Sequence, residues 1–538
     1  MQEQKWKSFF PYSQPREQQV SAINQAIAAR EAGKKFVILE AGTGVGKSAI
    51  GYTVARYINA HGNTDPGYQP GSYFLTTQKI LQEQYVKDFN STGMKSIKSS
   101  ANYSCRYYKN NTCAESLRTL RTAEKGSSFW NACAFNCNYK NEKKAFIDAP
   151  SGVTNFPYFL AETTYSGKLQ PRSVLVIDEC HNAEVQLSKF IEVAVTERFS
   201  KNFLKLTMPL IKTQKQAYDW IEEVYVPKLR AHKKHVEKIL AKHHGLKDKI
   251  QEFTSLAKQF ELLDKHICKL ERFLKLYDNN NWIFNEVPAQ DRKGRRLEFK
   301  PIDVAPFAND MLFKYGEFNI LMSATILNKD HFCELLGIDS NDAEFISIAS
   351  PFPVENRPIL TFPIGKMSSS EIEGTLPKLA EAVKSILDNH PNEKGIIHCH
   401  TFRIANFLKR NIRSNRIMIH DSDNREEVLK KHMASKKPTV LLSPSMTEGI
   451  DLKDDLSRFQ VICKVPYPYL GDKLIKKKMY KWKWWYPFQT AKTIIQSAGR
   501  SVRSIDDKAV TYIFDSDWER FYSRNKHLFP KDFRECIE

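Results

Sequence analysis

Two short segments of the chain contain the residue types that nucleotide chemistry requires. The first, EAGTGVGKS, occupies residues 40–48 and fits a phosphate-binding loop, except that Ala41 stands where the strict pattern has glycine. In such a loop the glycines let backbone N–H groups face phosphate oxygens, and the following helix adds its dipole. Lys47 would reach the β- and γ-phosphates, and Ser48 would bind Mg²⁺. The residues expected to bind the nucleotide here are Ala41, Gly42, Thr43, Gly44, Val45, Gly46, Lys47 and Ser48.

The second segment, VLVIDECHNAE at 174–184, places two acids directly after the pattern of a buried strand. Asp178 would hold Mg²⁺, directly or through water, and Glu179 would polarise the water that attacks the γ-phosphate. Carboxylates are also common at strand ends for purely structural reasons. In a chain that carries a phosphate loop, however, the pair predicts hydrolysis of ATP.

A third segment, QSAGRSVR at 496–503, contains two arginines three positions apart, so that both lie on one face of a helix. Guanidinium groups of Arg500 and Arg503 would stabilise the charge that develops on the transferring γ-phosphoryl group. Gln496, one turn earlier, would position water or the γ-phosphate. A solvated basic helix face is the alternative, but Gly499 beside Arg500 permits close approach to a ligand.

Four cysteines crowd into one polar and aromatic stretch, with the spacing Cys-x7-Cys-x19-Cys-x3-Cys. They are Cys105, Cys113, Cys133 and Cys137. Four thiolates suit zinc or an iron–sulfur cluster, and two disulfides are the third possibility. Only the last pair has the close spacing typical of zinc, and the whole pattern matches no standard ferredoxin run.

The composition of the 538-residue chain indicates which partners and which cellular location to expect. Its 81 basic and 61 acidic residues give a net charge of +20, which favours a polyanionic partner such as nucleic acid over a merely basic surface. No run of eighteen apolar residues predicts a membrane span, and the N-terminal residues lack the apolar stretch of a signal peptide. We therefore expect a cytoplasmic, reducing location, in which structural disulfides are rare.

Short apolar runs that alternate with helical patterns predict parallel sheets covered on both faces. They fall into two groups, before and after about residue 330. The runs lie at 36–39, 72–77, 173–178, 318–325, 394–400, 439–445 and 459–466. Two stretches interrupt the first group: the cysteine-bearing residues 91–150, and the hydrophilic, helical residues 190–295.

The motifs resemble those of superfamily 2 helicases. DECH looks like their DEAH-type box, and further matches follow in order. They are FPYSQPREQQ (10–19) for the adenine-contacting motif of the XPD/DinG branch, TTQKILQEQ (76–84) for motif Ia, LMSATI (321–326) for motif III, KGIIHCHTF (394–402) for motif IV, SPSMTEGIDL (443–452) for motif V and QSAGRSVR for motif VI. The resemblance implies that Gln18 contacts adenine. It also implies that Asp451 couples nucleotide to nucleic acid, although a turn-forming role is the alternative there.

The same resemblance implies an α/β fold with two RecA-like motor domains, the first of which carries an iron–sulfur insertion and a helical arch. The expected boundaries are 1–90, 151–190 and 296–330 for the three parts of motor domain 1, 91–150 for the four-cysteine insertion, 191–295 for the arch, and 331–538 for motor domain 2. The four cysteines would bind one [4Fe–4S] cluster, with zinc, disulfides or free thiols as alternatives.

The expected function is that of an ATP-dependent DNA helicase, which would be a monomeric motor that uses ATP and Mg²⁺. The resemblance implies 5′→3′ movement on single-stranded DNA and unwinding of forked or partly duplex DNA. The alternatives are a helicase for RNA or R-loops, a nuclease, and an ATPase that binds single strands without unwinding. The short stretches before the phosphate loop and after Arg503 leave little room for a nuclease domain.

Three basic regions could contact the strand. Residues 201–250 hold twelve Lys/Arg against five Asp/Glu, and 472–489 interleave six lysines with aromatic rings. Such lysines suit phosphates and such rings suit bases, although solvation and core packing are the ordinary alternatives. The candidate contacts are Lys476, Lys477 and Lys478, together with Tyr103, Arg106, Tyr107, Tyr108 and Lys109 around the first cysteine.

Overall fold

The computed structural model describes residues 5–42, 44–62, 65–120, 123–243, 249–289, 294–421, 424–444, 452, 454–502 and 504–538. The larger of its two parallel sheets has the strand order β10-β1-β9-β5-β2-β4-β3. The strands are β1 Phe36–Ala41, β2 Gln69–Thr76, β3 Met94–Ser96, β4 Ser151–Asn155, β5 Arg172–Asp178, β9 Gly316–Ser323 and β10 Ala343–Ile348. Every residue of the central strand β5 is buried, as expected for a sheet with both faces covered.

Alternate residues of each strand enter two different cores, because successive side chains point to opposite faces. Val37 and Leu39 of β1 pack with one set of helices, whereas Ile38 packs with another. The first set is α1 Glu17–Glu31, α2 Lys47–His61 and α3 Lys79–Phe89. The second includes α7 Phe156–Ala161, α8 Ala183–Ile191, α13 Ala305–Met311 and α14 Lys329–Leu336.

The second parallel sheet has the order β11-β16-β15-β12-β14-β13. Its strands are β11 Ile359–Gly365, β12 Gly395–His398, β13 Ile417–Ile419, β14 Val440–Ser443, β15 Phe459–Ile462 and β16 Val510–Asp515. Its helices are α15 Ile372–Asn389, α16 Phe402–Asn411, α17 Arg425–Ala434, α18 Lys473–Lys481, α19 Trp485–Ala498, α20 Asp517–Asn525 and α21 Lys531–Arg534. The chain crosses between the sheets after β10, so the first domain extends beyond residue 330, to about 348.

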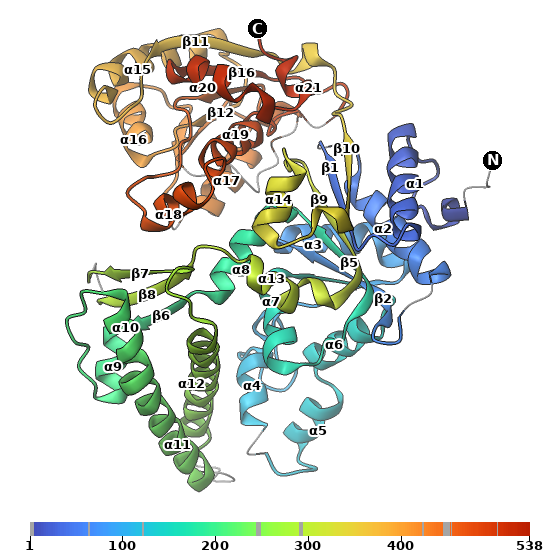
Figure 1. The fold of residues 1–538 in the computed structure, drawn as a ribbon, viewed down its shortest axis with the longest axis vertical. Coiled ribbons are helices and arrows are strands. Elements are labelled where there is room, and N and C mark those ends of the chain that lie inside the picture. The colour runs from blue at the N-terminus through green and yellow to red at the C-terminus, as the bar shows by residue number, and fades with distance from the viewer. Residues whose placement is uncertain are drawn as a thin grey trace.

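Two insertions leave the first sheet and lie in the lower half of the view in Figure 1. The four-cysteine insertion begins after β3, because residues 94–96 still pair in the sheet. Its helices are α4 Cys113–Thr119, α5 Ser128–Phe135 and α6 Asn138–Asp148. No described helix is long and apolar enough to cross a membrane.

The second insertion is the expected arch, but it stands on a small antiparallel sheet that the helical pattern did not predict. Its strands are β6 Val193–Thr196, β7 Trp282–Val287 and β8 Arg296–Pro301, and its helices are α9 Glu197–Leu204, α10 Gln214–Trp220, α11 Val226–His243 and α12 Ile250–Leu276. Helix α12 contacts α4 of the cysteine insertion. Arg118 pairs with Glu261 at 3.1 Å, and the hydroxyls of Thr119 and Thr254 lie 3.1 Å apart. The two insertions therefore meet at their outer parts.

Candidate nucleotide site

The phosphate loop connects β1 to α2 in the conformation that its glycines permit. Gly44 and Gly46 have φ angles of 83° and 84°, in the left-handed region that favours glycine. A Cβ atom on Gly46 would also lie 2.5 Å from the side chain of Gln19. Lys47 opens α2, and its Nζ donates to the carbonyl of Ala41 at 3.1 Å. Ala41 itself is buried in the core behind the loop, which explains why an alanine is accommodated there.

The loop is supported from behind by the segment that resembles the adenine-contacting motif. Arg16 donates to the carbonyl of Gly44 at 2.6 Å, and Gln19 Nε2 donates to the carbonyl of Val45 at 2.9 Å. Gln18, the residue predicted from the sequence, lies instead on the exposed face of α1. Two adjacent glutamines fit the motif equally well, and the structure brings Gln19 rather than Gln18 to the loop.

The acid pair lies at the carboxyl end of β5. Asp178 is buried and accepts hydrogen bonds from the hydroxyl of Tyr85 and the backbone N–H of Glu179, both at 3.0 Å. Burial and the charge of Glu179 raise the pKa of Asp178, while nearby Lys47 opposes that shift. Glu179 has a φ angle of 52°, a conformation that costs a non-glycine residue about 1–3 kcal/mol and is concentrated at functional sites.

Motif III connects these acids to the second domain. His181 contacts Glu179 Oε2 at 3.3 Å and the hydroxyl of Ser323 at 2.7 Å. Two residues further along, the hydroxyl of Thr325 accepts a hydrogen bond from Gln496 Nε2 at 3.1 Å. His181, Ser323 and Thr325 were not predicted as site residues, although all three lie within motifs that the sequence displays.

The two domains enclose a cleft of about 1010 Å³, slightly above the roughly 300–1,000 Å³ of ordinary ligand pockets. Gly42 and Glu179 line it from the first domain, and Gln496 and Arg500 line it from the second. Arg500 follows the end of α19, two residues after Ala498, so the prediction that it lies on a helix face is wrong. Thr43, Asp451 and Arg503 lie outside the described residues.

Comparisons with known proteins agree with this geometry. Residues 12–208 match the family model of the type III restriction enzyme res subunit, and residues 384–536 match that of a helicase C-terminal domain. The ATP-dependent DNA helicase YoaA of Escherichia coli is 22% identical over 94% of this chain and 92% of its own length. The ATP-dependent DNA helicase DinG of Photobacterium profundum is 26% identical, over 41% of this chain and only 34% of the relative.

Solved structures show the fold. An XPD helicase matches 96% of this chain and 99% of its own, with a TM-score of 0.65 at 16% identity, and Xpd4 of S. tokodaii matches 97% and 99% with a TM-score of 0.58 at 14% identity. Together these matches support a superfamily 2 helicase of the XPD/DinG type. The predicted pair of RecA-like motor domains is thereby confirmed.

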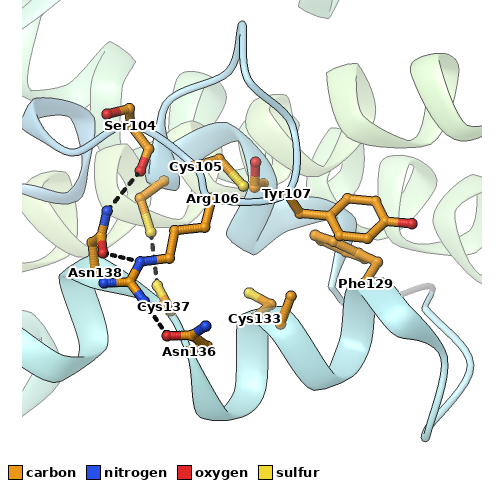
Figure 2. A pocket seen from close by; sticks show the side chains of 12 residues that line it. Ser104, Cys105, Arg106, Tyr107, Phe129, Cys133, Asn136, Cys137 and Asn138 are labelled. Carbon is orange, nitrogen blue, oxygen red and sulfur yellow. Dashed lines mark hydrogen bonds between the residues drawn. The ribbon is translucent and has the colours of Figure 1, made fainter.

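The four cysteines of this helicase line a single pocket (Figure 2). None of them is in a disulfide, and the sulfurs of Cys113 and Cys137 are 3.0 Å apart, well beyond the ~2.05 Å of a disulfide bond. Burial and Cys137 raise the pKa of the Cys113 thiol to about 12. None of the described residues that line the pocket carries a carboxylate or an imidazole. Within the described ranges, no three His, Cys, Asp or Glu side chains meet the geometry for one metal ion.

The lysine- and aromatic-rich segment of the helicase joins its motor domains. Lys478 is buried and pairs with Glu184 of α8, while Lys481 pairs with Asp303 at 2.5 Å. Trp482 Nε1 donates to Glu334 at 2.7 Å. Lys478 therefore has an internal partner in place of the predicted strand contact. Its neighbours Lys476 and Lys477 are exposed.

Proposed function

We propose that this helicase hydrolyses ATP between its two motor domains to move along single-stranded DNA and to unwind forked or partly duplex DNA. The observation that carries the proposal is the hydrogen bond from Gln496 to Thr325, which joins the two domains beside Glu179. The net charge of +20 supports a nucleic-acid track, and the relatives are named as ATP-dependent DNA helicases. A single polypeptide supplies both walls of the cleft, which supports a monomeric motor.

The chemistry follows from the residues around the cleft. Lys47 and the loop N–H groups would bind the β- and γ-phosphates, while Ser48 and Asp178 would hold Mg²⁺, which neutralises phosphate charge when bound. Glu179, held by His181, would orient and polarise the attacking water. Arg500 would stabilise the charge on the transferring phosphoryl group from the opposite wall. Arg503 and Asp451 keep their predicted roles as proposals.

The track and direction are tested together. ATP hydrolysis should be stimulated by single-stranded DNA more than by RNA of the same sequence. Duplexes with a 5′ single-stranded tail should be unwound, and those with a 3′ tail should not, as the family resemblance implies. Stronger stimulation by RNA, or unwinding only of RNA–DNA hybrids, would replace the DNA proposal with the RNA or R-loop alternative.

We further propose that the four cysteines bind one [4Fe–4S] cluster. All four thiols line one pocket, and a cubane cluster takes one thiolate at each of its four irons, whereas the sequence lacks the two close cysteine pairs typical of zinc. A bound cation would also offset the raised pKa of Cys113, because coordinated thiols are deprotonated. When bound, the cluster would supply a rigid connection among segments of an insertion that is too small to build a large core.

Replacing Arg500 with alanine should lower ATP turnover by roughly 10³-fold, the effect typical of losing an arginine that stabilises a phosphoryl-transfer transition state. Affinity for single-stranded DNA should change little. Steady-state ATPase assays and strand-binding titrations measure the two effects. Arg524→Ala, on the exposed side of α20, removes a comparable charge from the same domain and should leave both values unchanged. Normal turnover in Arg500→Ala would show that the second domain does not complete the site.

Strand binding should weaken steeply with salt, since bound lysines and arginines release counterions from the phosphates. The logarithm of the binding constant should fall against the logarithm of salt concentration with a slope of roughly −0.7 for each phosphate contacted. Fluorescence anisotropy with a labelled oligonucleotide at several salt concentrations gives this slope. A flat dependence would count against a basic track.

A further inference from the structure

Glu40 is the fifth residue of β1 and lies immediately before the phosphate loop, but its side chain contacts a different motif. One carboxylate oxygen, Oε1, accepts hydrogen bonds from two successive backbone N–H groups, those of Ile326 at 2.7 Å and Leu327 at 2.6 Å. The other oxygen is 3.5 Å from the hydroxyl of Ser347. A single side chain thus joins the end of β1 to the backbone at the end of motif III and to the residue that follows it.

The backbone held by Glu40 needs such support. Leu327 has a φ angle of 65°, in the left-handed region that a leucine rarely adopts, and such a conformation persists only where its surroundings enforce it. The residue just before this turn is Thr325, which accepts the hydrogen bond from Gln496. The position of Thr325 is therefore set from one side by Ser323, which His181 contacts, and from the other by Glu40.

The surroundings of Glu40 indicate that its carboxylate is there for these hydrogen bonds. Burial raises its pKa, and the N–H groups of Leu327 and Ile326 oppose that shift. The charge of Asp532, in the second domain, raises the pKa of Glu40 further. A partly buried carboxylate beside another acid is costly to keep charged unless hydrogen bonds satisfy it, and the two N–H groups do so.

The same strand end also reaches the nucleotide-binding lysine. Ala41, the next residue, offers its carbonyl to Lys47 Nζ at 3.1 Å. Two adjacent residues thus contact two different parts of the site. The carbonyl of Ala41 contacts Lys47, which would bind the β- and γ-phosphates. The carboxylate of Glu40 contacts the turn that follows Thr325, the residue bonded to the second domain.

We propose that Glu40 is a positioning residue that couples the phosphate loop to motif III, so that occupation of the loop is transmitted through Thr325 to Gln496 and the second motor domain. The inference rests on the proposed ATPase function. Glu40 lines the same cleft as Glu179, and its inferred role there is to keep Thr325 in place. Its loss should therefore reduce turnover that depends on domain closure more than it reduces nucleotide binding.

The test compares Glu40→Ala, Glu40→Gln and wild type in the full chain. In Glu40→Ala, the turnover number with saturating single-stranded DNA should fall at least tenfold, while the Kd for a fluorescent ATP analogue should stay within about threefold. Glu40→Gln should keep most of the activity, because an amide oxygen can accept the same two hydrogen bonds. Glu317→Ala is the matched control, since it removes a partly buried glutamate, paired with Arg30, from the opposite end of the same sheet. It should behave as wild type.

A double-mutant cycle with Thr325→Val shows whether both residues act in one chain of contacts. The combined variant Glu40→Ala/Thr325→Val should be no slower than the slower single variant. Multiplicative losses would overturn the proposal, as would wild-type stimulation in Glu40→Ala. Equal defects in Glu40→Gln and Glu40→Ala would overturn the hydrogen-bond basis.

A readout without activity separates this inference from the proposed function. Amide hydrogen exchange at residues 326 and 327 should be faster in Glu40→Ala than in wild type, and little changed in Glu40→Gln, whether or not the protein hydrolyses ATP. Unchanged exchange in Glu40→Ala would show that Glu40 does not hold the turn. If wild type does not hydrolyse ATP but the exchange pattern is as expected, only the ATPase proposal is contradicted.

Discussion

The Glu179→Gln variant is expected to bind ATP normally and to lose almost all turnover. Glutamine keeps the size of the side chain but cannot take a proton from water, and losing a positioned general base typically costs about 10²–10⁴-fold in rate. The contacts to Asp178 through the backbone and to His181 through the side chain would still place it at the same point of the cleft. Equilibrium binding of a labelled nucleotide and steady-state hydrolysis in the presence of single-stranded DNA measure the two properties.

Lys47→Ala provides the contrast, because it removes the cation expected at the β- and γ-phosphates and should lose both binding and hydrolysis. The two variants therefore distinguish the role of Lys47 in binding the nucleotide from the role of Glu179 in hydrolysing it. If Glu179→Gln hydrolyses ATP at a near-normal rate, another group activates the water and the catalytic acid has been assigned wrongly.

The second large effect is expected from Cys133→Ser, which removes one of the four thiols in the insertion pocket. Its bound metal should be lost and residues 97–150 should loosen, because the remaining insertion has little core of its own. Hydrolysis of ATP without DNA should survive better, since Lys47 and Glu179 lie outside the insertion. Unwinding should fail. Iron and zinc analysis, limited proteolysis and a strand-displacement assay measure these changes.

Cys268→Ser is the matched control, since Cys268 lies on α12 outside the pocket and should change neither metal content nor unwinding. Stoichiometric zinc without iron in anaerobically purified wild type would contradict the cluster. A metal-free Cys133→Ser protein that unwinds as fast as wild type would instead contradict the mechanical role of the insertion.

The sequence motifs predicted those parts of the site that one short segment of the chain supplies. A phosphate loop needs glycines at fixed offsets, and an acid pair needs a strand end, so both leave a pattern within a dozen residues. The structure places Lys47 near Asp178, and Gln496 beside motif III, as the motif order led us to expect. The family and the two-domain fold are likewise confirmed.

Contacts between distant segments left no such pattern. Gln19 and Gln18 are indistinguishable until the helix shows which one faces the loop. In the sequence, Glu40 is an ordinary strand residue, and only the folded structure shows the turn that packs against it. Likewise, no residue near Lys478 in the sequence indicates that Glu184 is its partner. Short strands were missed for a related reason, because three residues such as Met94–Ser96 carry too little periodicity to stand out.

The place of β1 between β9 and β10 in the first sheet has a consequence for how the protein is made. Both of its neighbours, β9 and β10, begin only at residues 316 and 343. At a synthesis rate of about 5–20 residues per second, the ribosome would expose this apolar strand for roughly 15–60 s before either partner emerged. In the second sheet, β11 also waits for a late partner, β16, but that strand begins at residue 510, so the stretch of chain between them is shorter. Nascent chains stopped before residue 316 should thus be the ones that chaperones retain.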